Sequence, residues 1–346
     1  MPGFLSWISA FFAPASSARV TSNPRLLNPA RAPHEEDPGE HVKMHQLEQH
    51  LFCWLLDTTP SALLKEPDSE SQAILDALDD RIDRQSLEEL PRQPMTLPML
   101  TRALSDEKTD RKALTKIILS DPALTDQLLH VANSPLFHPG DRPIESVDQA
   151  VFILGLNGIR NVISAAVMRP MMAARNSREA LFAQRVWRWG LTCAKAAELV
   201  ANLKGRDGSV FFMAGLLPAL SYITLRRELV RIARTHPNFS EPQPGLIHQA
   251  LSRYQWATAQ VLANEWKLSP SYHAKLLEAE RPTPNTSHSP LNDGIIIGTR
   301  EVLRHAHQRN MSEEDVLKLI YISHEKYTRI RLAILDSLDA GARSRA

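Results

Sequence analysis

Apolar side chains recur at intervals of three and four residues along most of this 346-residue chain. Leu124, Leu128 and Leu129 show the pattern, and no segment after residue 90 alternates between apolar and polar residues. Intervals of three and four place side chains on one face of an α-helix, whereas strict alternation is typical of a strand. The sequence therefore predicts an all-α fold.

Capping residues indicate several helix boundaries. Asp121 can accept hydrogen bonds from free backbone N–H groups, and Pro122 suits a first turn that needs no donor. Ser146 caps a further helix, and Gly155 ends it. Pro218 lies inside a predicted helix and is expected to kink or split it. The predicted helices cover residues 41–56, 69–82, 97–104, 110–119, 122–132, 146–154, 157–168, 182–203, 210–233, 246–266, 270–279, 292–308 and 312–338.

Composition excludes several classes of protein. Lys and Arg number 40 against 39 Asp and Glu, so the formal charge of +1 does not favour bulk binding to nucleic acid. The two cysteines, Cys53 and Cys193, are far apart and form no CxxC pair, which fits a reducing compartment. No uninterrupted apolar run reaches the roughly 20 residues that span a bilayer. We therefore expect a cytoplasmic protein.

The N-terminal segment 1–40 is rich in proline among Ser, Ala and Arg. Proline removes a backbone donor and restricts the preceding residue, so little regular structure is expected there. The prolines of this segment are Pro2, Pro14, Pro24, Pro29, Pro33 and Pro38.

A set of short motifs, taken in order, resembles the HDOD family, the HD-related output domains of bacterial signalling proteins. The motifs are Leu90-Pro91 with Pro94, Asp121-Pro122-Ala123-Leu124, Leu128-Leu129, Ala132-Asn133-Ser134, Ala150 with Leu154-Gly155, Trp187, Gly215-Leu216-Leu217, Glu265-Trp266 and Ile297-Gly298-Thr299. The resemblance implies a multi-helix, HD-like orthogonal bundle. With the segments outside it, the predicted organisation is a disordered segment 1–40, a helical extension 41–84, the HDOD domain 85–290 and C-terminal helices 291–346 that pack on the bundle.

The resemblance also implies where a metal site would lie, because HD phosphohydrolases hold metal ions with His and Asp. Where the family tends to have Trp-x-His-Ser, this chain has Trp187-Arg188-Trp189-Gly190. Where it often has Gly-Leu-Leu-His-Asp, this chain has Gly215-Leu216-Leu217-Pro218-Ala219. Trp256 occupies the position of a later His in the family, and Ala279-Glu280 occupies the position of a final His pair.

Indole, pyrrolidine and methyl groups offer no lone pair to a hard metal ion. We therefore expect no metal ligands, no cofactor and no catalysis, with Trp189, Pro218, Ala219 and Trp256 in place of the ligands. Bulky side chains at these positions are expected to fill the space of the ancestral site as a closed core.

The leading functional hypothesis is a regulatory module that binds other proteins through a helix face. The resemblance implies partners in bacterial signalling, including two-component receivers and cyclic-dinucleotide pathways. Asn133, Ser134 and Arg160 are the candidate polar residues at the rim of such a surface. Asn133 and Ser134 could equally form a helix C-cap alone, and Arg160 a solvated charge.

Two alternatives stay open. Helix 146–154, Gly155 and helix 157–168 imitate a helix-turn-helix, which would indicate a nucleic-acid-binding regulator. The second helix, however, offers few polar side chains to a groove: Arg160, Asn161 and Arg169. A metal-dependent phosphohydrolase is the other alternative. The crowded arginines Arg226, Arg227, Arg231 and Arg234 are expected to form an ion-paired surface.

Overall fold

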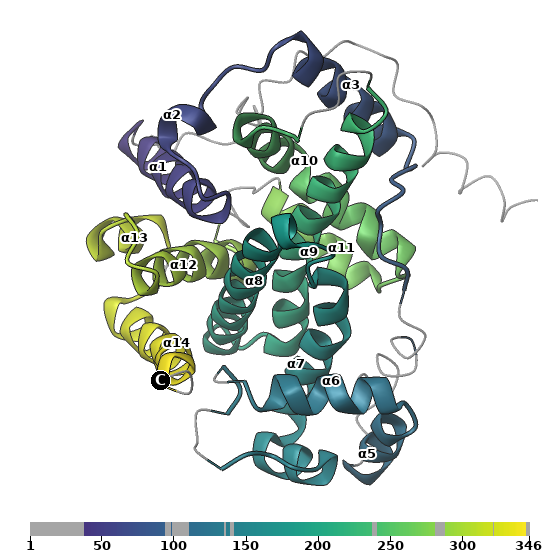
Figure 1. The fold of residues 1–346 in the computed structure, drawn as a ribbon. Coiled ribbons are helices and arrows are strands. Elements are labelled where there is room, and N and C mark those ends of the chain that lie inside the picture. Colours follow the sequence, from purple (N-terminus) through teal and green to yellow (C-terminus); the bar gives the residue numbers. More distant parts are fainter. Residues whose placement is uncertain are drawn as a thin grey trace, which may run out of the picture. The chain divides into compact units, whose positions relative to one another are not determined.

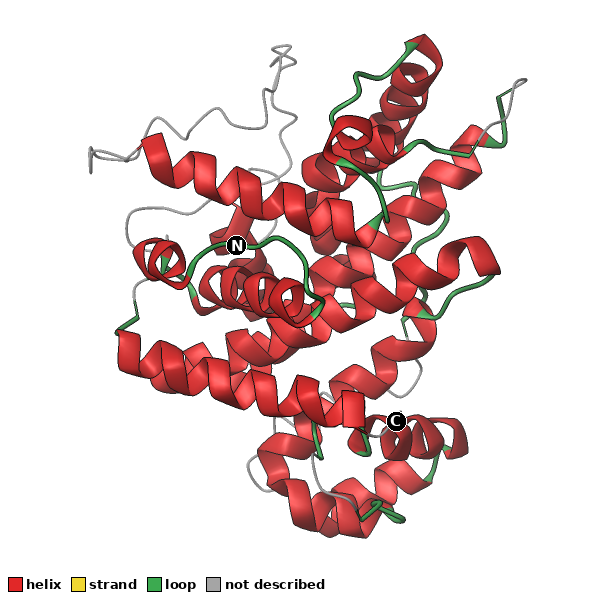
Figure 2. Ribbon diagram, turned by 60° about the vertical axis from the view of Figure 1, so that its left-hand side comes forward, coloured by secondary structure: helices red, strands yellow, loops and turns green. Residues whose placement is uncertain are grey.

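The computed structural model describes residues 38–93, 98, 111–134, 136–138, 142–236, 241–280, 288–320 and 322–343. The regular elements in these ranges are all helices, with no strand among them (Figure 2). The prediction of an all-α fold is confirmed. The segment 1–37 and most of the predicted helix 97–104 lie outside the described residues.

The chain forms its helices in the order seen in Figure 1. Their bounds are α1 Pro38–Leu55, α2 Pro60–Leu63, α3 Ser69–Asp83, α5 Arg111–Leu119, α6 Pro122–Ala132, α7 Val147–Met172, α8 Ser177–Leu203, α9 Gly208–Ala233, α10 Pro244–Glu265, α11 Pro270–Glu280, α12 Pro290–His305, α13 Glu313–Leu319 and α14 His324–Arg343.

Most predicted boundaries agree with these helices within a few residues, and the predicted caps are present. The Asp121 side chain accepts from the N–H of Leu124, and Ser146 caps α7 through the N–H of Gln149. One continuous helix was expected over 312–338, but the structure has two, α13 and α14. Ile320 adopts an extended conformation that ends α13, and the backbone restarts as a helix at His324.

Two residues expected to interrupt helices behave differently. Gly155 bends α7, with φ 65° and ψ −179°, so the predicted break is confirmed although the helix resumes at once. Pro218 does not split α9, which continues from Gly208 to Ala233. Pro218 is fully enclosed by the core, where packing on all sides compensates for the hydrogen bond that proline cannot donate.

The core is centred on α8, α9 and α12, which pack closely against one another (Figure 1). Small residues permit this approach. A Cβ added at Gly298 would lie 2.6 Å from the Cα of Cys193, and one at Gly294 would lie 2.5 Å from the Cα of Ala197. Because the added atom would meet main chain, α8 and α12 are in backbone-to-backbone contact.

The helical extension is tied to the bundle by a buried carboxylate. Glu228 of α9 is fully buried, pairs with Arg81 of α3, and accepts hydrogen bonds from the backbone N–H groups of Glu88 and Glu89 at 3.0 and 2.9 Å. The Glu228 carboxylate thus accepts from the Arg81 guanidinium and from the two backbone N–H groups. The connection that follows α3 is fixed to the bundle by this carboxylate.

The C-terminal helices are joined to the bundle by a second buried carboxylate. Glu301 of α12 is fully buried, pairs with Arg300 and Arg304, and accepts from the Tyr327 hydroxyl of α14 at 3.3 Å. This carboxylate thereby connects α14 to α12.

Helix α9 is long and apolar enough, by composition, to cross a membrane. However, 89% of its apolar window is buried within the bundle, as is usual for the central helix of a globular core. Among the described residues no other helix meets the same test.

Candidate functional site

Trp189 lies in the centre of the bundle, on α8. Its side chain is 2% exposed, and its indole N–H donates to the Thr299 hydroxyl of α12 at 2.9 Å. Its ring stacks on Tyr222 of α9, with centroids 4.9 Å apart and an angle of 7° between the planes. Burial, and then the nearby carboxylate of Glu48, raise the pKa of the Tyr222 phenol well above its usual range. Trp189 therefore lies in a buried environment made mainly of aromatic and apolar groups.

Pro218 and Ala219 are buried at the contact between α8 and α9. A Cβ added at Gly190 of α8 would lie 2.5 Å from the Cβ of Ala219. The two helices therefore touch at this level, and the methyl group of Ala219 occupies the space between them. A larger side chain at either position would force the helices apart.

Trp256 does not fill the interior as expected for a closed core. It is half-buried on α10 and packs against the margin of the core. The buried side of α10 includes Tyr254 and Thr258. Trp256 is two residues from each, which is about 200° around the helix, so it faces away from the centre.

Phe52 of α1 extends the aromatic packing outward. Its ring lies 5.6 Å from Tyr222, tilted by 36°, and 4.7 Å from His248 of α10 in an edge arrangement. We call Trp189, Tyr222 and Phe52 the aromatic cluster. Phe52 is fully buried, so α1 covers the side of Tyr222 that would otherwise face outward.

Polar contacts surround Phe52 along α1. Glu48 accepts from the Ser252 hydroxyl of α10 at 3.1 Å, and Lys43 pairs with Asp315 of α13 at 2.6 Å. Arg185 of α8 donates to the Trp54 carbonyl and lies over the Trp54 ring. Helix α1 thus contacts helices on several sides of the bundle at once.

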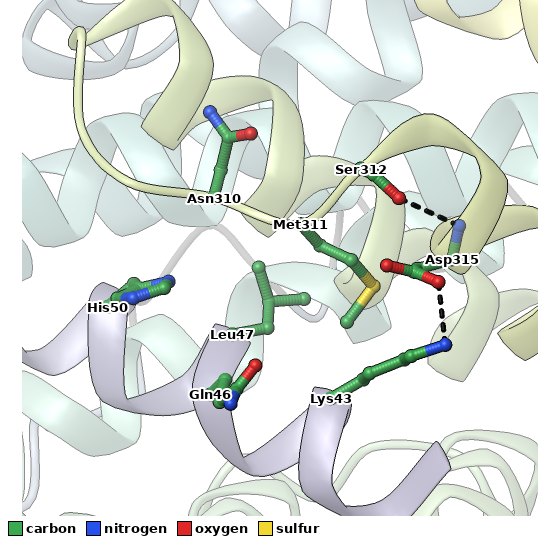
Figure 3. Close-up of a pocket in the computed structure, with 8 residues that line it drawn as sticks. All are labelled: Lys43, Gln46, Leu47, His50, Asn310, Met311, Ser312 and Asp315. Carbon is green, nitrogen blue, oxygen red and sulfur yellow. Dashed lines mark hydrogen bonds and ion pairs between the residues drawn. The ribbon is translucent and has the colours of Figure 1, made fainter. Parts of the chain in front are cut away.

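A small cavity lies between α1 and the start of α13 (Figure 3). Its volume is about 90 Å³. Burial, and then the positive charge of Arg309, lower the pKa of His50, and no hydrogen bond reaches the buried Nδ1 of its ring. The lining residues are Lys43, Gln46, Leu47, His50, Asn310, Met311, Ser312 and Asp315.

Asn133, a candidate rim residue, forms the C-terminal cap of α6. Its amide nitrogen donates to the carbonyls of Leu129 and Ile144 at 2.9 and 2.8 Å, and its oxygen accepts from the N–H of Ile144 at 2.7 Å. The side chain therefore ties the end of α6 to the segment before α7. Its φ of −81° is right-handed, so the left-handed conformation that its sequence context allows is not used.

The other two candidates have different surroundings. The Ser134 hydroxyl is buried and has no hydrogen-bond partner. Arg160 is half-buried on the second half of α7, and its charge acts on Tyr272 of α11, whose pKa burial raises to about 12. Asn133 contacts the start of α7 and Arg160 lies next to α11, so these residues face different neighbours.

The part of α7 after Gly155 has the spacing of a buried helix. Ile159, Val162 and Ile163 are at most 1% exposed, and Asn161 is 1% exposed. A helix that reads a DNA groove needs a polar outer face. The exposed apolar residues of α7, Phe152 and Ile153, lie before the bend instead.

Of the four arginines expected to form an ion-paired surface, Arg227 and Arg231 pair with glutamates. Arg231 pairs with Glu88 and Glu89, and Arg227 pairs with the buried Glu179 at 2.6 Å. Arg226 lies over the ring of Phe182. These three arginines thus make their contacts within the protein.

Within the described part of the chain, no group of three or more His, Cys, Asp or Glu side chains has a metal-binding arrangement. Cys193, next to Trp189 on α8, is buried, and burial raises the pKa of its thiol.

The sequence matches the model of the HDOD domain over residues 90–282, which is more than half of the chain. No curated protein matches it. The matched span contains Trp189, Tyr222 and His248, whereas Phe52 and Thr299 lie outside it.

Solved structures with similar folds include three bacterial proteins. A provisionally named metal-dependent phosphohydrolase from Shewanella amazonensis SB2B has a TM-score of 0.58 at 20% identity, over 81% of this chain and all of its own. An HDOD domain protein of unknown function from Geobacter sulfurreducens has a TM-score of 0.50 at 19% identity, over 77% of this chain and 94% of its own. A provisionally named signal transduction protein from Marinobacter aquaeolei VT8 has a TM-score of 0.50 at 17% identity, over 79% of this chain and 67% of its own. At these identities the likeness shows a shared helical fold.

Proposed function

The chain belongs to the HDOD family, and from this premise we propose that it is a non-catalytic output or scaffold module of bacterial signalling that acts in the cytoplasm by binding other proteins. The aromatic cluster carries the proposal. Trp189 and Ala219, which stand where the family resemblance places metal ligands, are buried. Their apolar groups offer nothing to a metal ion.

The surroundings of Trp189 support the same conclusion. Metal-assisted hydrolysis needs a bound ion, an open coordination position and a water that can reach it. Here the Trp189 indole N–H, its only donor, is hydrogen-bonded to Thr299, and Tyr222 stacks on its ring. Phe52 then covers Tyr222. The burial of these three aromatic rings supports the proposal that no substrate phosphate reaches this position.

The nucleic-acid alternative has less support. Its reading helix would be the part of α7 after Gly155, whose side chains are largely in the core. Arg227 and Arg231 of α9 pair with glutamates, which leaves them less able to neutralise phosphates.

The test has a chemical arm and a binding arm. In the first, purified full-length protein is analysed for bound metal and assayed on phosphomonoesters and phosphodiesters with Mg²⁺, Mn²⁺ or no added metal. We expect substoichiometric metal and hydrolysis equal to that of heat-denatured protein. Metal-dependent turnover above that blank would contradict the proposal.

In the binding arm, immobilised full-length protein captures partners from bacterial extract, and each captured protein is purified and titrated back. We expect a saturable one-to-one complex with a bacterial signalling protein, with Kd on the order of 1 μM or tighter. Duplex DNA serves as the matched competitor. Binding to DNA that weakens steeply with salt, with no protein complex, would favour the nucleic-acid alternative.

A further inference from the structure

Helix α1 packs against α2, α8, α12 and α13, and single side chains of α9 and α10 also reach it. We use the name α1 contact surface for the residues outside α2 that contact α1 through a ring, a hydrogen bond or an ion pair. It consists of Arg185 of α8, Tyr222 of α9, His248 and Ser252 of α10, and Asp315 of α13. Its centre is aromatic and its edges are polar. Such an arrangement is typical of surfaces that accept an amphipathic helix.

The apolar face of α1 matches this surface in a defined pattern. Leu47, Leu51, Phe52 and Leu55 are at most 4% exposed and stand at positions i, i+4, i+5 and i+8. Lys43, four residues before Leu47, adds the ion pair with Asp315. Helix recognition depends on anchors of this spacing.

The edges of the contact are weaker than its centre. The side chains of Lys43 and Asp315 are 30% and 27% exposed, and Asp57, the partner of Arg185, is 69% exposed. Ion pairs that water reaches contribute little. The cavity of about 90 Å³ beside His50 leaves one edge of α1 incompletely packed.

The neighbouring parts of the extension are fixed more firmly. Helix α3 is held by the pair of Arg81 with the fully buried Glu228. A Cβ added at Gly245 of α10 would lie 3.4 Å from the Leu63 carbonyl at the end of α2 and 2.8 Å from the carbonyl of Lys65, which follows α2. Between Leu55 and α2, Asp57 has a positive φ of 51° and is exposed. A short turn thus joins α1, whose peripheral contacts are weak, to α2 and α3, which are held more firmly.

We propose that the α1 contact surface is the partner-binding surface of this protein, and that α1 is a displaceable internal occupant of it. The partner is an amphipathic helix that repeats the pattern of α1: large apolar residues at i, i+4, i+5 and i+8, and a basic residue four positions before the first. The inference rests on the proposed function, because it names the surface and the partner chemistry for that binding.

Displacement has a quantitative consequence. A competing helix binds only the fraction of molecules whose α1 is detached, so its apparent affinity falls by that fraction. Weakening the docking of α1 raises the fraction and strengthens binding of the competitor. A rigid structural helix would give no such gain.

The experiment uses full-length protein and a fluorescent peptide with the sequence of residues 41–57, followed by anisotropy. The protein variants are Phe52→Ala, which removes the central anchor, and Lys43→Ala, which removes the edge pair and keeps the core intact. Arg329→Ala is the matched control, because it removes an exposed pair with Glu325 on α14. A peptide carrying Phe52→Ala is the ligand control.

We expect the Phe52→Ala protein to bind the peptide at least tenfold more tightly than wild type, Lys43→Ala about two- to threefold more tightly, and Arg329→Ala with unchanged affinity. The altered peptide should bind at least tenfold more weakly. Equal affinity for all proteins, or no binding, overturns the inference. Should Phe52→Ala fail to fold, the comparison of Lys43→Ala with wild type and Arg329→Ala decides.

Hydrogen exchange on wild-type protein provides a second measurement. We expect the amides of residues 45–55 to exchange through a local opening, at least tenfold faster than the amides of residues 216–225 in α9. Equal exchange in the two helices would mean that α1 leaves only on global unfolding, and would overturn the inference.

A competition experiment separates this inference from the proposed function. The peptide is added to a complex with a captured protein partner. Displacement of the partner supports the inference. A partner that binds without being displaced overturns the inference and leaves the proposed function intact, whereas peptide binding without any protein partner contradicts the proposed function alone.

Discussion

Single residues with similar sequence signals have different roles in this protein. Asn133 and Ser134 are adjacent, polar and both candidates for a binding surface. In the structure the Asn133 amide satisfies three backbone groups, whereas the Ser134 hydroxyl is buried without a hydrogen bond. Adjacent substitutions therefore separate a structural role from a binding role.

We predict that Asn133→Ala lowers the free energy of unfolding by about 1–3 kcal/mol, because the N–H and carbonyl of Ile144 lose their partner. Ser134→Ala should change it by less than about 0.5 kcal/mol, since no hydrogen bond is lost. Urea denaturation of both variants measures the difference. Normal stability of Asn133→Ala combined with loss of partner binding would instead make Asn133 a contact residue.

Acid should destabilise the protein through His50. Burial, and then the charge of Arg309, lower its pKa in the folded state below the ordinary 6.5. Lys43 and Asp315 line the same cavity, with opposite charges. Because the unfolded chain takes up the proton first, stability is complete above about pH 6.5 and declines as the pH falls towards the folded pKa.

The measurement compares urea midpoints at pH 7.5 and 5.5 for wild type and His50→Gln. We expect the glutamine variant to lose less stability on acidification than wild type. His307→Gln is the control, because the His307 side chain is exposed after the end of α12. An identical pH dependence in wild type and His50→Gln would contradict the prediction.

At the scale of helices and turns, Gly155 is the residue whose backbone geometry is most restrictive. Its φ of 65° with ψ of −179° lies in a region that is essentially limited to glycine. An added Cβ would meet nothing within 4 Å. Any cost of substitution is therefore conformational and does not come from crowding.

We predict that Gly155→Ala lowers the free energy of unfolding by about 1–3 kcal/mol. Chemical denaturation measures it, and circular dichroism should show unchanged helix content, since both halves of α7 have their own contacts. An unchanged midpoint would mean that α7 can straighten at no cost.

The sequence predicts helices well because their signals are local. Apolar spacing, Asp121 with Pro122, and Ser146 lie within a few residues of the boundary they define, and the structure has these caps. The break between α13 and α14 was not predicted, since the apolar spacing continues across it. The prediction that Trp256 fills the interior was wrong. Its alignment with a family ligand position does not determine which face of α10 it lies on.

The site could be predicted only in part for the same reason. Substitution of the expected ligands is visible at Trp189 and Ala219 through the resemblance. Phe52 covers this site although it lies some 140 residues earlier in the chain. That contact depends on tertiary packing, which a local sequence pattern does not predict. A choice between the two roles of Asn133 required the position of Ile144. The contact between these residues is also not visible in the local sequence.

At the scale of the whole molecule, buried carboxylates join the N- and C-terminal helices to the bundle. Glu228 is the better test, because it is fully buried and holds both Arg81 and the segment that follows α3. Without the charge of Glu228, Arg81 would keep only the half-exposed Glu88 as its partner, and the backbone N–H groups of Glu88 and Glu89 would lose a charged acceptor.

We predict that Glu228→Gln lowers the free energy of unfolding by about 3–5 kcal/mol. The control, Glu325→Gln, removes an exposed pair on α14 and should change it by less than about 0.5 kcal/mol. Urea denaturation followed by circular dichroism gives both values. Equal small effects would mean that α3 does not depend on this carboxylate.

The close approach of α8 to α9 and α12 has a consequence for the history of the protein. Gly190 touches Ala219, and Gly294 and Gly298 lie against the main chain of α8. A hydrated ion needs room for itself and for each water, about 30 Å³ apiece. Histidine at position 189 would free only the volume of the Trp189 indole, because Gly190 and Ala219 already touch beside it. Under the proposed function, a return to metal-dependent hydrolysis would require new spacing between the backbones of α8 and α9 as well as new side chains.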